Sequence, residues 1–126
     1  MYRISKEFHF SASHQLDHLP EGHQCARMHG HNYVVIVELE HYELNIDGFV
    51  VDYGKLDPFK EFIDEKFEHR NLNEVLGSGI ETTAENLAKY FYDTLRDDDY
   101  GVGYYSLVSA VTVKETDKTA ARYSLD

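Results

Sequence analysis

Three histidines in the first third of the chain have the spacing of a metal site. His29 and His31 flank Gly30, so on an extended strand their imidazoles project from the same face. His14 ends the upstream run Phe10-Ser11-Ala12-Ser13-His14. Two imidazoles on one face and a third from a neighbouring segment suit a borderline metal such as Zn²⁺, and three protein ligands leave the fourth position open for chemistry. Any one of the eight histidines could be an ordinary polar residue, but the combination favours a metal.

Cys25, the only cysteine of the chain, lies four residues before His29. A bound metal and the neighbouring Arg27 would both favour the thiolate, so Cys25 is a candidate nucleophile or acid/base group. The alternative is a small buried hydrophobic residue, which is common for a free cysteine.

Two further groups could take part in acid/base chemistry or ligand binding. Glu68 precedes His69, and a carboxylate can orient an imidazole or accept its proton. The alternative is a histidine that interacts with the dipole of a helix C-terminus. Glu115 ends an alternating strand pattern, where a carboxylate could accept two hydrogen bonds from an amidine-like edge or simply be solvated.

Length and composition limit the class of protein. A chain of 126 residues predicts one domain over residues 1–126, with room for one core. The net charge of −11, from 23 acidic and 12 basic residues, argues against bulk binding of nucleic acid or anionic membrane. A single cysteine excludes an intrachain disulfide framework, and no signal-like or membrane-spanning apolar run is present, so we expect a cytoplasmic protein.

The hydrophobic pattern predicts an α+β domain with an antiparallel sheet and two helices on one face. Asp57-Pro58 is typical of an N-cap followed by proline, and Thr82 with Glu85 has the spacing of a capping box. The two helices carry apolar stripes at Phe59, Phe62 and Ile63, and at Leu87, Phe91 and Leu95. Strands are expected at Tyr2–Ser13, His31–Glu43 (with Tyr33, Val35, Val37 and Leu39 on one face), Phe49–Tyr53 and Tyr105–Glu115, with an acidic loop at Asp97–Gly103. A sheet this small could be completed by other subunits.

Together these residues resemble the 6-pyruvoyltetrahydropterin synthase family, most closely its bacterial 6-carboxy-5,6,7,8-tetrahydropterin synthases of queuosine and deazapurine biosynthesis. The resemblance covers nearly the whole chain. Its landmarks are Phe10–His14, Cys25, His29–Tyr33, Phe49–Tyr53, Glu68–Asn73, Thr82–Asn86 and Val113–Thr116. The three-residue gap between Cys25 and His29 favours the carboxy-forming branch.

The resemblance implies a tunnelling fold (T-fold), with a four-stranded antiparallel sheet and two helices per subunit, trimeric barrels and a homohexamer of two trimers. It implies that Zn²⁺ is held by His14, His29 and His31, that Cys25 is catalytic, and that His69 is its partner from across a subunit interface. Glu115 and Thr83 would contact the pterin, and Arg27 is a candidate for the triphosphate. The family usually has aspartate where this chain has Glu68, so the place of Glu68 in the relay stays open.

The implied reaction converts 7,8-dihydroneopterin triphosphate to 6-carboxy-5,6,7,8-tetrahydropterin, with release of acetaldehyde and triphosphate. Two alternatives remain at this point. One is a 6-pyruvoyltetrahydropterin synthase or a related enzyme that cleaves the dihydroneopterin side chain. The other is a zinc- and pterin-binding protein without turnover.

Overall fold

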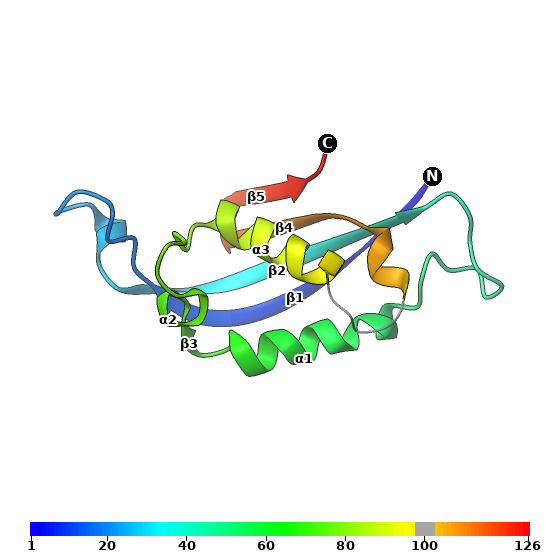
Figure 1. The fold of residues 1–126 in the computed structure, drawn as a ribbon, viewed down its shortest axis with the longest axis horizontal. Helices are drawn as coiled ribbons and strands as arrows, with labels where there is room; N and C mark the ends of the chain where they lie inside the picture. Colours follow the sequence, from blue (N-terminus) through cyan, green and yellow to red (C-terminus); the bar gives the residue numbers. More distant parts are fainter. Residues whose placement is uncertain (98–102) are drawn as a thin grey trace.

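A curved sheet runs the length of the molecule and carries its helices on one side (Figure 1). The computed structural model describes residues 1–97 and 103–126. The strands lie in the order β3-β1-β2-β4-β5. Neighbours are antiparallel except for the short β3, which runs parallel to β1. The bounds are β1 Tyr2–His14, β2 His29–His41, β3 Arg70–Asn71, β4 Val108–Thr116 and β5 Thr119–Ser124.

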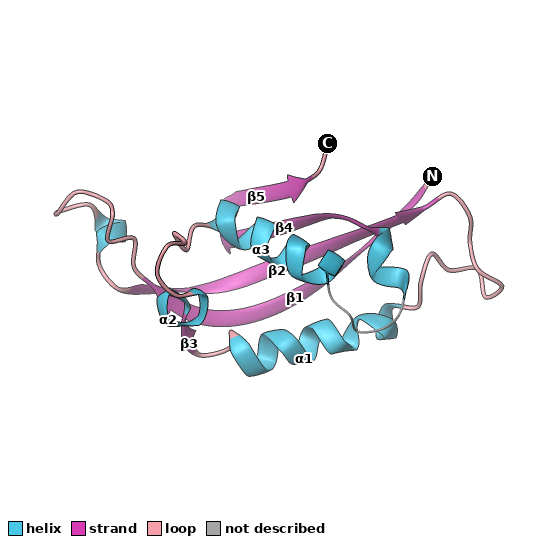
Figure 2. Cartoon of the chain, viewed as in Figure 1, coloured by secondary structure: helices cyan, strands magenta, loops and turns pink. Residues whose placement is uncertain are grey.

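Three α-helices and three 3₁₀ turns complete the described chain (Figure 2). Their bounds are α1 Asp57–Lys66, α2 Leu72–Leu76 and α3 Ala84–Asp97, with 3₁₀ turns at Gln24–Ala26, Tyr53–Leu56 and Gly103–Leu107. No helix in the described ranges is long and apolar enough to cross a membrane.

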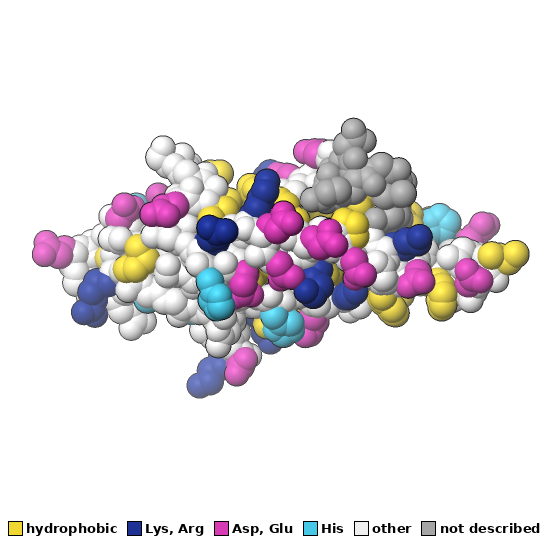
Figure 3. Space-filling view, turned by 90° about the horizontal axis from the view of Figure 1, so that it is seen from below, with side chains coloured by type: hydrophobic (Ala, Val, Ile, Leu, Met, Phe, Trp, Pro, Cys, Tyr) yellow, Lys and Arg dark blue, Asp and Glu magenta, His cyan; other side chains and the backbone are white. Residues whose placement is uncertain are grey.

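The core lies between the sheet and the two longer helices. In β1 the even-numbered residues from Phe8 to His14 are buried, and in β2 the odd-numbered residues from Tyr33 to Leu39 are buried. This period of two places one face of each strand against α1 and α3. Aromatic rings join the layers: Phe8 packs against Phe59 of α1 at 5.0 Å between ring centroids. On the side of the molecule that Figure 3 shows, acidic and basic side chains are interspersed.

The predicted α+β class, the antiparallel character of the sheet and the helix pair are confirmed, and three of the expected strands are present as β1, β2 and β4. The sheet has five strands, and β3, β5 and the short helix α2 were not predicted. The strand expected at Phe49–Tyr53 is wrong, because local side-chain bonds form turns on both sides of this segment. Asn45 Oδ1 accepts the N–H groups of Asp47 and Phe49, each at 3.0 Å. Asp52 Oδ1 accepts the N–H of Gly54 at 2.9 Å and starts a 3₁₀ turn instead.

Both helix starts differ from the expected caps. α1 begins at Asp57 with Leu56 at the N-cap, and Leu56 makes no side-chain cap bond. At α3 the capping hydroxyl is that of Thr83, which accepts the N–H of Asn86 at 3.2 Å, because the Thr82 hydroxyl is directed to His14.

The last predicted strand is also shorter than expected. It begins at Val108 because the preceding residues form a 3₁₀ turn. A register shift opposite Glu38 and Leu39 breaks the simple alternation, so Val108 and Val111 are both buried. The acidic loop expected at Asp97–Gly103 falls mainly on residues 98–102, which lie outside the described part.

Candidate metal and catalytic site

The strand register brings the three histidines together. His14 lies directly opposite His29 in the β1–β2 ladder, and His31 lies two residues further along β2, opposite Ala12. Directly opposite residues of an antiparallel pair share a face, and so do residues i and i+2. One ligand atom from each histidine therefore lies within 4.8 Å of the other two. The cluster is on the helix-covered face at one end of the sheet.

Hydrogen bonds to backbone carbonyls orient two of the rings. His14 Nδ1 lies 2.8 Å from the carbonyl oxygen of Thr82 and 3.0 Å from its Oγ1. His29 Nδ1 lies 2.7 Å from the carbonyl oxygen of Arg27. A carbonyl can only accept, so each Nδ1 carries the hydrogen and each Nε2 keeps a free lone pair. Such contacts fix the tautomer that a metal requires.

Burial favours the neutral form of two of these imidazoles, those of His14 and His31. It lowers the pKa of His14 to about 4, and it is also the main cause of a lowered pKa at His31, where the charge on His29 adds to the effect. Neutral imidazole is the form that ligates metals. The Nε2 atoms of His14 and His31 are buried without a hydrogen-bond partner among the described residues, so the donor set fits a metal ion.

Glu115 lies beside the histidine cluster, at the end of β4. Its Oε2 is 3.6 Å from His31 Nε2, and the backbone N–H of Ala84, at the start of α3, donates to its carboxylate. Burial raises the pKa of Glu115 and outweighs this hydrogen bond. A cavity of about 190 Å³ opens here, lined by Ala84, Glu85, Glu115, Thr119, Ala120 and Ala121. A half-buried carboxylate at such a cavity can accept N–H groups of a ligand.

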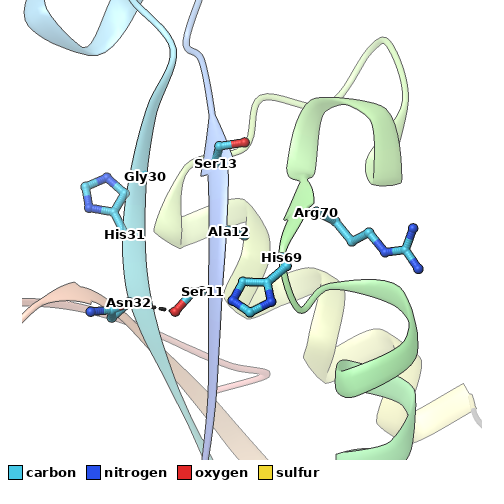
Figure 4. A pocket seen from close by; sticks show the side chains of 8 residues that line it. All are labelled: Ser11, Ala12, Ser13, Gly30, His31, Asn32, His69 and Arg70. Carbon is cyan, nitrogen blue, oxygen red and sulfur yellow. Dashed lines mark hydrogen bonds between the residues drawn. The ribbon is translucent and has the colours of Figure 1, made fainter.

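His69 lies away from this cluster within one chain. It lines a cavity of about 420 Å³ with Ser11, Ala12, Ser13, Gly30, His31, Asn32 and Arg70. In Figure 4 the His69 ring lies beside β1 and the His31 ring lies beyond β2, with both strands between them. The side chain of His69 is 82% exposed, and its Nε2 is 3.4 Å from Glu68 Oε1. A single chain therefore does not bring His69 to the three histidines.

Cys25 lies in the 3₁₀ turn of the loop that joins β1 to β2, and it is half-buried. Its N–H donates to His23 Nδ1 at 3.0 Å, and its carbonyl accepts the N–H of Leu16 at 2.9 Å. Arg27 is exposed and acts on the cluster through its carbonyl. The Thr83 hydroxyl caps α3.

A family model described as 6-pyruvoyl tetrahydropterin synthase matches residues 3–126. The chain belongs to this family. The 6-carboxy-5,6,7,8-tetrahydropterin synthase of Synechocystis sp. is 36% identical over 133 aligned residues, covering 98% of this chain and 93% of the relative. The enzyme of the same name from Bacillus subtilis is 29% identical over 100 residues, covering 75% and 66%. The prediction of an enzyme of this family is confirmed, because relatives from several species carry that name.

Solved structures of the family share the fold. The 6-pyruvoyl tetrahydropterin synthase of Caenorhabditis elegans superposes with a TM-score of 0.84 and 28% identity, covering 99% of this chain and 96% of that one. An uncharacterized protein of Wolinella succinogenes superposes with a TM-score of 0.83 and 26% identity, covering 99% and 98%. The T-fold expected for the single subunit is therefore confirmed.

Sequence reasoning did not find two residues beside the cluster. Thr82 was assigned to a helix cap, yet it orients His14. Tyr33 is 1% exposed and packs edge-on against His31 at 5.5 Å between ring centroids. Its hydroxyl has no hydrogen-bond partner among the described residues. Burial, followed by the charge of Glu115, raises the pKa of Tyr33. The position of Tyr33 on the same strand face as His31 was the available signal.

Proposed function

We propose that this family member is a zinc-dependent lyase that converts 7,8-dihydroneopterin triphosphate to 6-carboxy-5,6,7,8-tetrahydropterin, releasing acetaldehyde and triphosphate. The observation that carries the proposal is the convergence of three imidazoles beside a half-buried glutamate. The names of the relatives support the carboxy-forming reaction. Zinc, when bound, would act as a Lewis acid that lowers the pKa of the substrate's side-chain hydroxyls.

Residues of the chain would bind the pterin, transfer protons and attract the triphosphate. The Glu115 carboxylate would accept two N–H groups of the pterin ring in the cavity beside Ala84, and so direct the substrate side chain toward the histidines. Thr83, at the start of α3, would lie against the ring. Cys25, as a thiolate, would move protons at the side-chain carbons, with His69 as the complementary acid/base group. Glu68 would support His69, and Arg27 would attract the triphosphate.

His69 is proposed to act in the site of a neighbouring subunit, since its own ring lies across β1 and β2 from the cluster. Two open edges support an assembly of this kind. Within the described chain, β3 pairs with β1 only at Ala12 and Ser13, and β5 forms the opposite edge of the sheet. Exposed edges invite pairing with another copy. We therefore propose trimeric barrels stacked as a homohexamer, to be tested by native mass spectrometry.

The proposed setting is a reducing cytoplasm, because a lone catalytic thiolate must stay reduced. Residues 1–126 would act as one domain, which a single cooperative unfolding transition would support. The proposed place in queuosine biosynthesis predicts that cells without the gene lose queuosine from their transfer RNA.

The test of function is an anaerobic incubation of zinc-loaded protein with 7,8-dihydroneopterin triphosphate, followed by mass spectrometry of the pterin and assays for acetaldehyde and triphosphate. Equimolar 6-carboxytetrahydropterin and acetaldehyde would support the lyase. A 6-pyruvoyl product would instead assign the 6-pyruvoyltetrahydropterin synthase activity, the activity named for the Caenorhabditis elegans structure. Bound zinc without triphosphate release would indicate a binding protein and refute the proposal.

Two variants test the roles of the residues. Cys25→Ala should abolish turnover and spare zinc, so unchanged turnover would exclude the thiolate mechanism. His29→Ala should lose zinc, measured by elemental analysis against the wild type, and full zinc stoichiometry in this variant would exclude the histidine triad.

A further inference from the structure

The loop that carries Cys25 joins two metal-ligand positions, since it leaves β1 after His14 and enters β2 at His29. Most hydrogen bonds of the described loop residues are internal, such as His23 N–H to the carbonyl of Pro20 at 3.0 Å. Among the described residues, three polar side-chain contacts join the loop to residues outside it. They are between Asn73 and Gln15, between His18 and Glu81 at 2.7 Å, and between His29 Nδ1 and the carbonyl of Arg27 at 2.7 Å.

The Asn73 contact is a double hydrogen bond to a single backbone unit. Asn73 Oδ1 accepts the N–H of Gln15 at 2.8 Å, and Asn73 Nδ2 donates to the carbonyl of Gln15 at 2.9 Å. The side-chain amide thus pairs with the first residue beyond β1 as another strand would. Asn73 is itself held in the first turn of α2, where its own N–H donates to Asn71 Oδ1 at 3.0 Å.

This pairing continues a series of bonds along the outer edge of β1. His69 N–H donates to the carbonyl of Ser11 at 2.7 Å, and β3 then pairs with Ala12 and Ser13. Asn73 extends the series to Gln15, one residue beyond the ligand His14. Segment 69–73 therefore fixes the last residues of β1 and the first residue of the loop.

The Asn73–Gln15 contact is linked to Cys25 through Leu16. Leu16, next to Gln15, donates its N–H to the carbonyl of Cys25 at 2.9 Å. We propose that Asn73 is a positioning residue that holds the Cys25 loop at a fixed place beside His14. The catalytic consequence rests on the role of Cys25 in the proposed function, whereas the placement of the loop does not.

The test follows alkylation of Cys25 by iodoacetamide in metal-free, substrate-free protein. Because the chain has one cysteine, the rate reports this position alone. Asn73→Ala removes both bonds to Gln15, and we expect alkylation at least fivefold faster than in the wild type, since Cys25 is half-buried in the folded loop. Asn45→Ala is the matched control: it removes two side-chain-to-backbone bonds in residues 45–49, at the other end of the molecule (Figure 1), and should leave the rate unchanged.

A second variant separates positioning from general loss of stability. Asn73→Asp keeps an acceptor for the Gln15 N–H but places a carboxylate oxygen against the Gln15 carbonyl. Protonation restores a donor there, so the ratio of variant to wild-type alkylation should fall toward one as pH is lowered through the carboxyl's titration. A ratio of variant to wild-type alkylation that stays high as pH is lowered would contradict the hydrogen-bond explanation, and this test holds even when Asn73→Ala fails to fold.

Turnover provides the final readout. In a zinc-loaded enzyme, Asn73→Ala should lower kcat at least tenfold with little change in KM, because Glu115 lies on a different strand from the loop. An alkylation rate within twofold of the wild type in folded Asn73→Ala would overturn the positioning role. If the wild type has no turnover, the proposed function fails, and the alkylation results still decide the placement of the loop.

Discussion

Acidification should destabilise the metal-free protein through His14. Burial lowers its pKa to about 4 in the folded state, against 6.5 for the unperturbed group. Between these values the unfolded chain binds more protons than the folded one, so stability is lost as pH falls through this window. The stability that neutral His14 provides is fully present above pH 6.5.

The size of the effect follows from the two pKa values. One pKa unit corresponds to about 1.4 kcal/mol, so the complete loss is about 3 kcal/mol, and about 2.5 kcal/mol of it falls between roughly pH 7.5 and 4.5. The lowered pKa of His31 adds a change of the same sign. The raised pKa of Glu115 acts in the opposite direction, because the folded state takes up that proton first as pH falls.

A variant isolates the contribution of His14. Urea unfolding at the two pH values, followed by circular dichroism at one protein concentration, gives the pH-dependent loss of unfolding free energy in the wild type and in His14→Phe. His14→Phe keeps a ring but cannot titrate, so its loss should be smaller by about 2.5 kcal/mol. A difference below about 1 kcal/mol would refute the reasoning, since it would mean that His14 takes up its proton without leaving its buried place.

Three other substitutions test single contacts. Thr82→Val removes the hydroxyl that lies 3.0 Å from His14 Nδ1 but keeps the backbone carbonyl. The affinity for zinc, measured in competition with a chromophoric chelator, should fall about tenfold. An unchanged affinity would show that the hydroxyl does not orient the ring. Tyr33→Phe removes a buried hydroxyl that has no partner among the described residues, so the unfolding free energy should stay the same or rise by about 1 kcal/mol, whereas a clear loss would reveal a partner. Glu68→Asp should lower the unfolding free energy by about 1 kcal/mol, because the shorter side chain cannot accept the hydrogen bond from the Ser11 N–H. Glu68→Gln should keep this bond and the wild-type stability. Equal losses of unfolding free energy in the two variants would contradict this explanation.

Local pattern predicted the elements that carry the three clustered histidines. Runs of aromatic and β-branched residues located most of β1 and β2, and the two-residue spacing of His29 and His31 placed both on one face, because a period of two is enough to define the face of a strand. The helices α1 and α3 followed from their apolar stripes, whose members Phe59 and Phe91 now pack together at 5.8 Å between ring centroids.

Features that depend on distant partners could not be predicted in this way. Thr82 lies 68 residues from His14, and its hydroxyl fits a helix cap equally well until the fold brings the two residues together. Thr119, Ala120 and Ala121 give β5 a weak strand pattern. This strand forms because it pairs with β4 and because Tyr123 packs on Tyr92 of α3 at 5.1 Å between ring centroids.

The backbone beside Glu68 holds the neighbouring His69 in place, which bears on the expected difference between this glutamate and an aspartate. His69 has a φ of 55°, a left-handed conformation that residues other than glycine seldom adopt, and its N–H to the Ser11 carbonyl at 2.7 Å holds it there. Glu68 Oε1 then lies 3.1 Å from the Ser11 nitrogen and 3.4 Å from His69 Nε2. The longer side chain therefore reaches the strand edge and the imidazole with one oxygen. Because the backbone fixes His69 independently, the extra methylene changes the reach of the carboxylate without separating the pair.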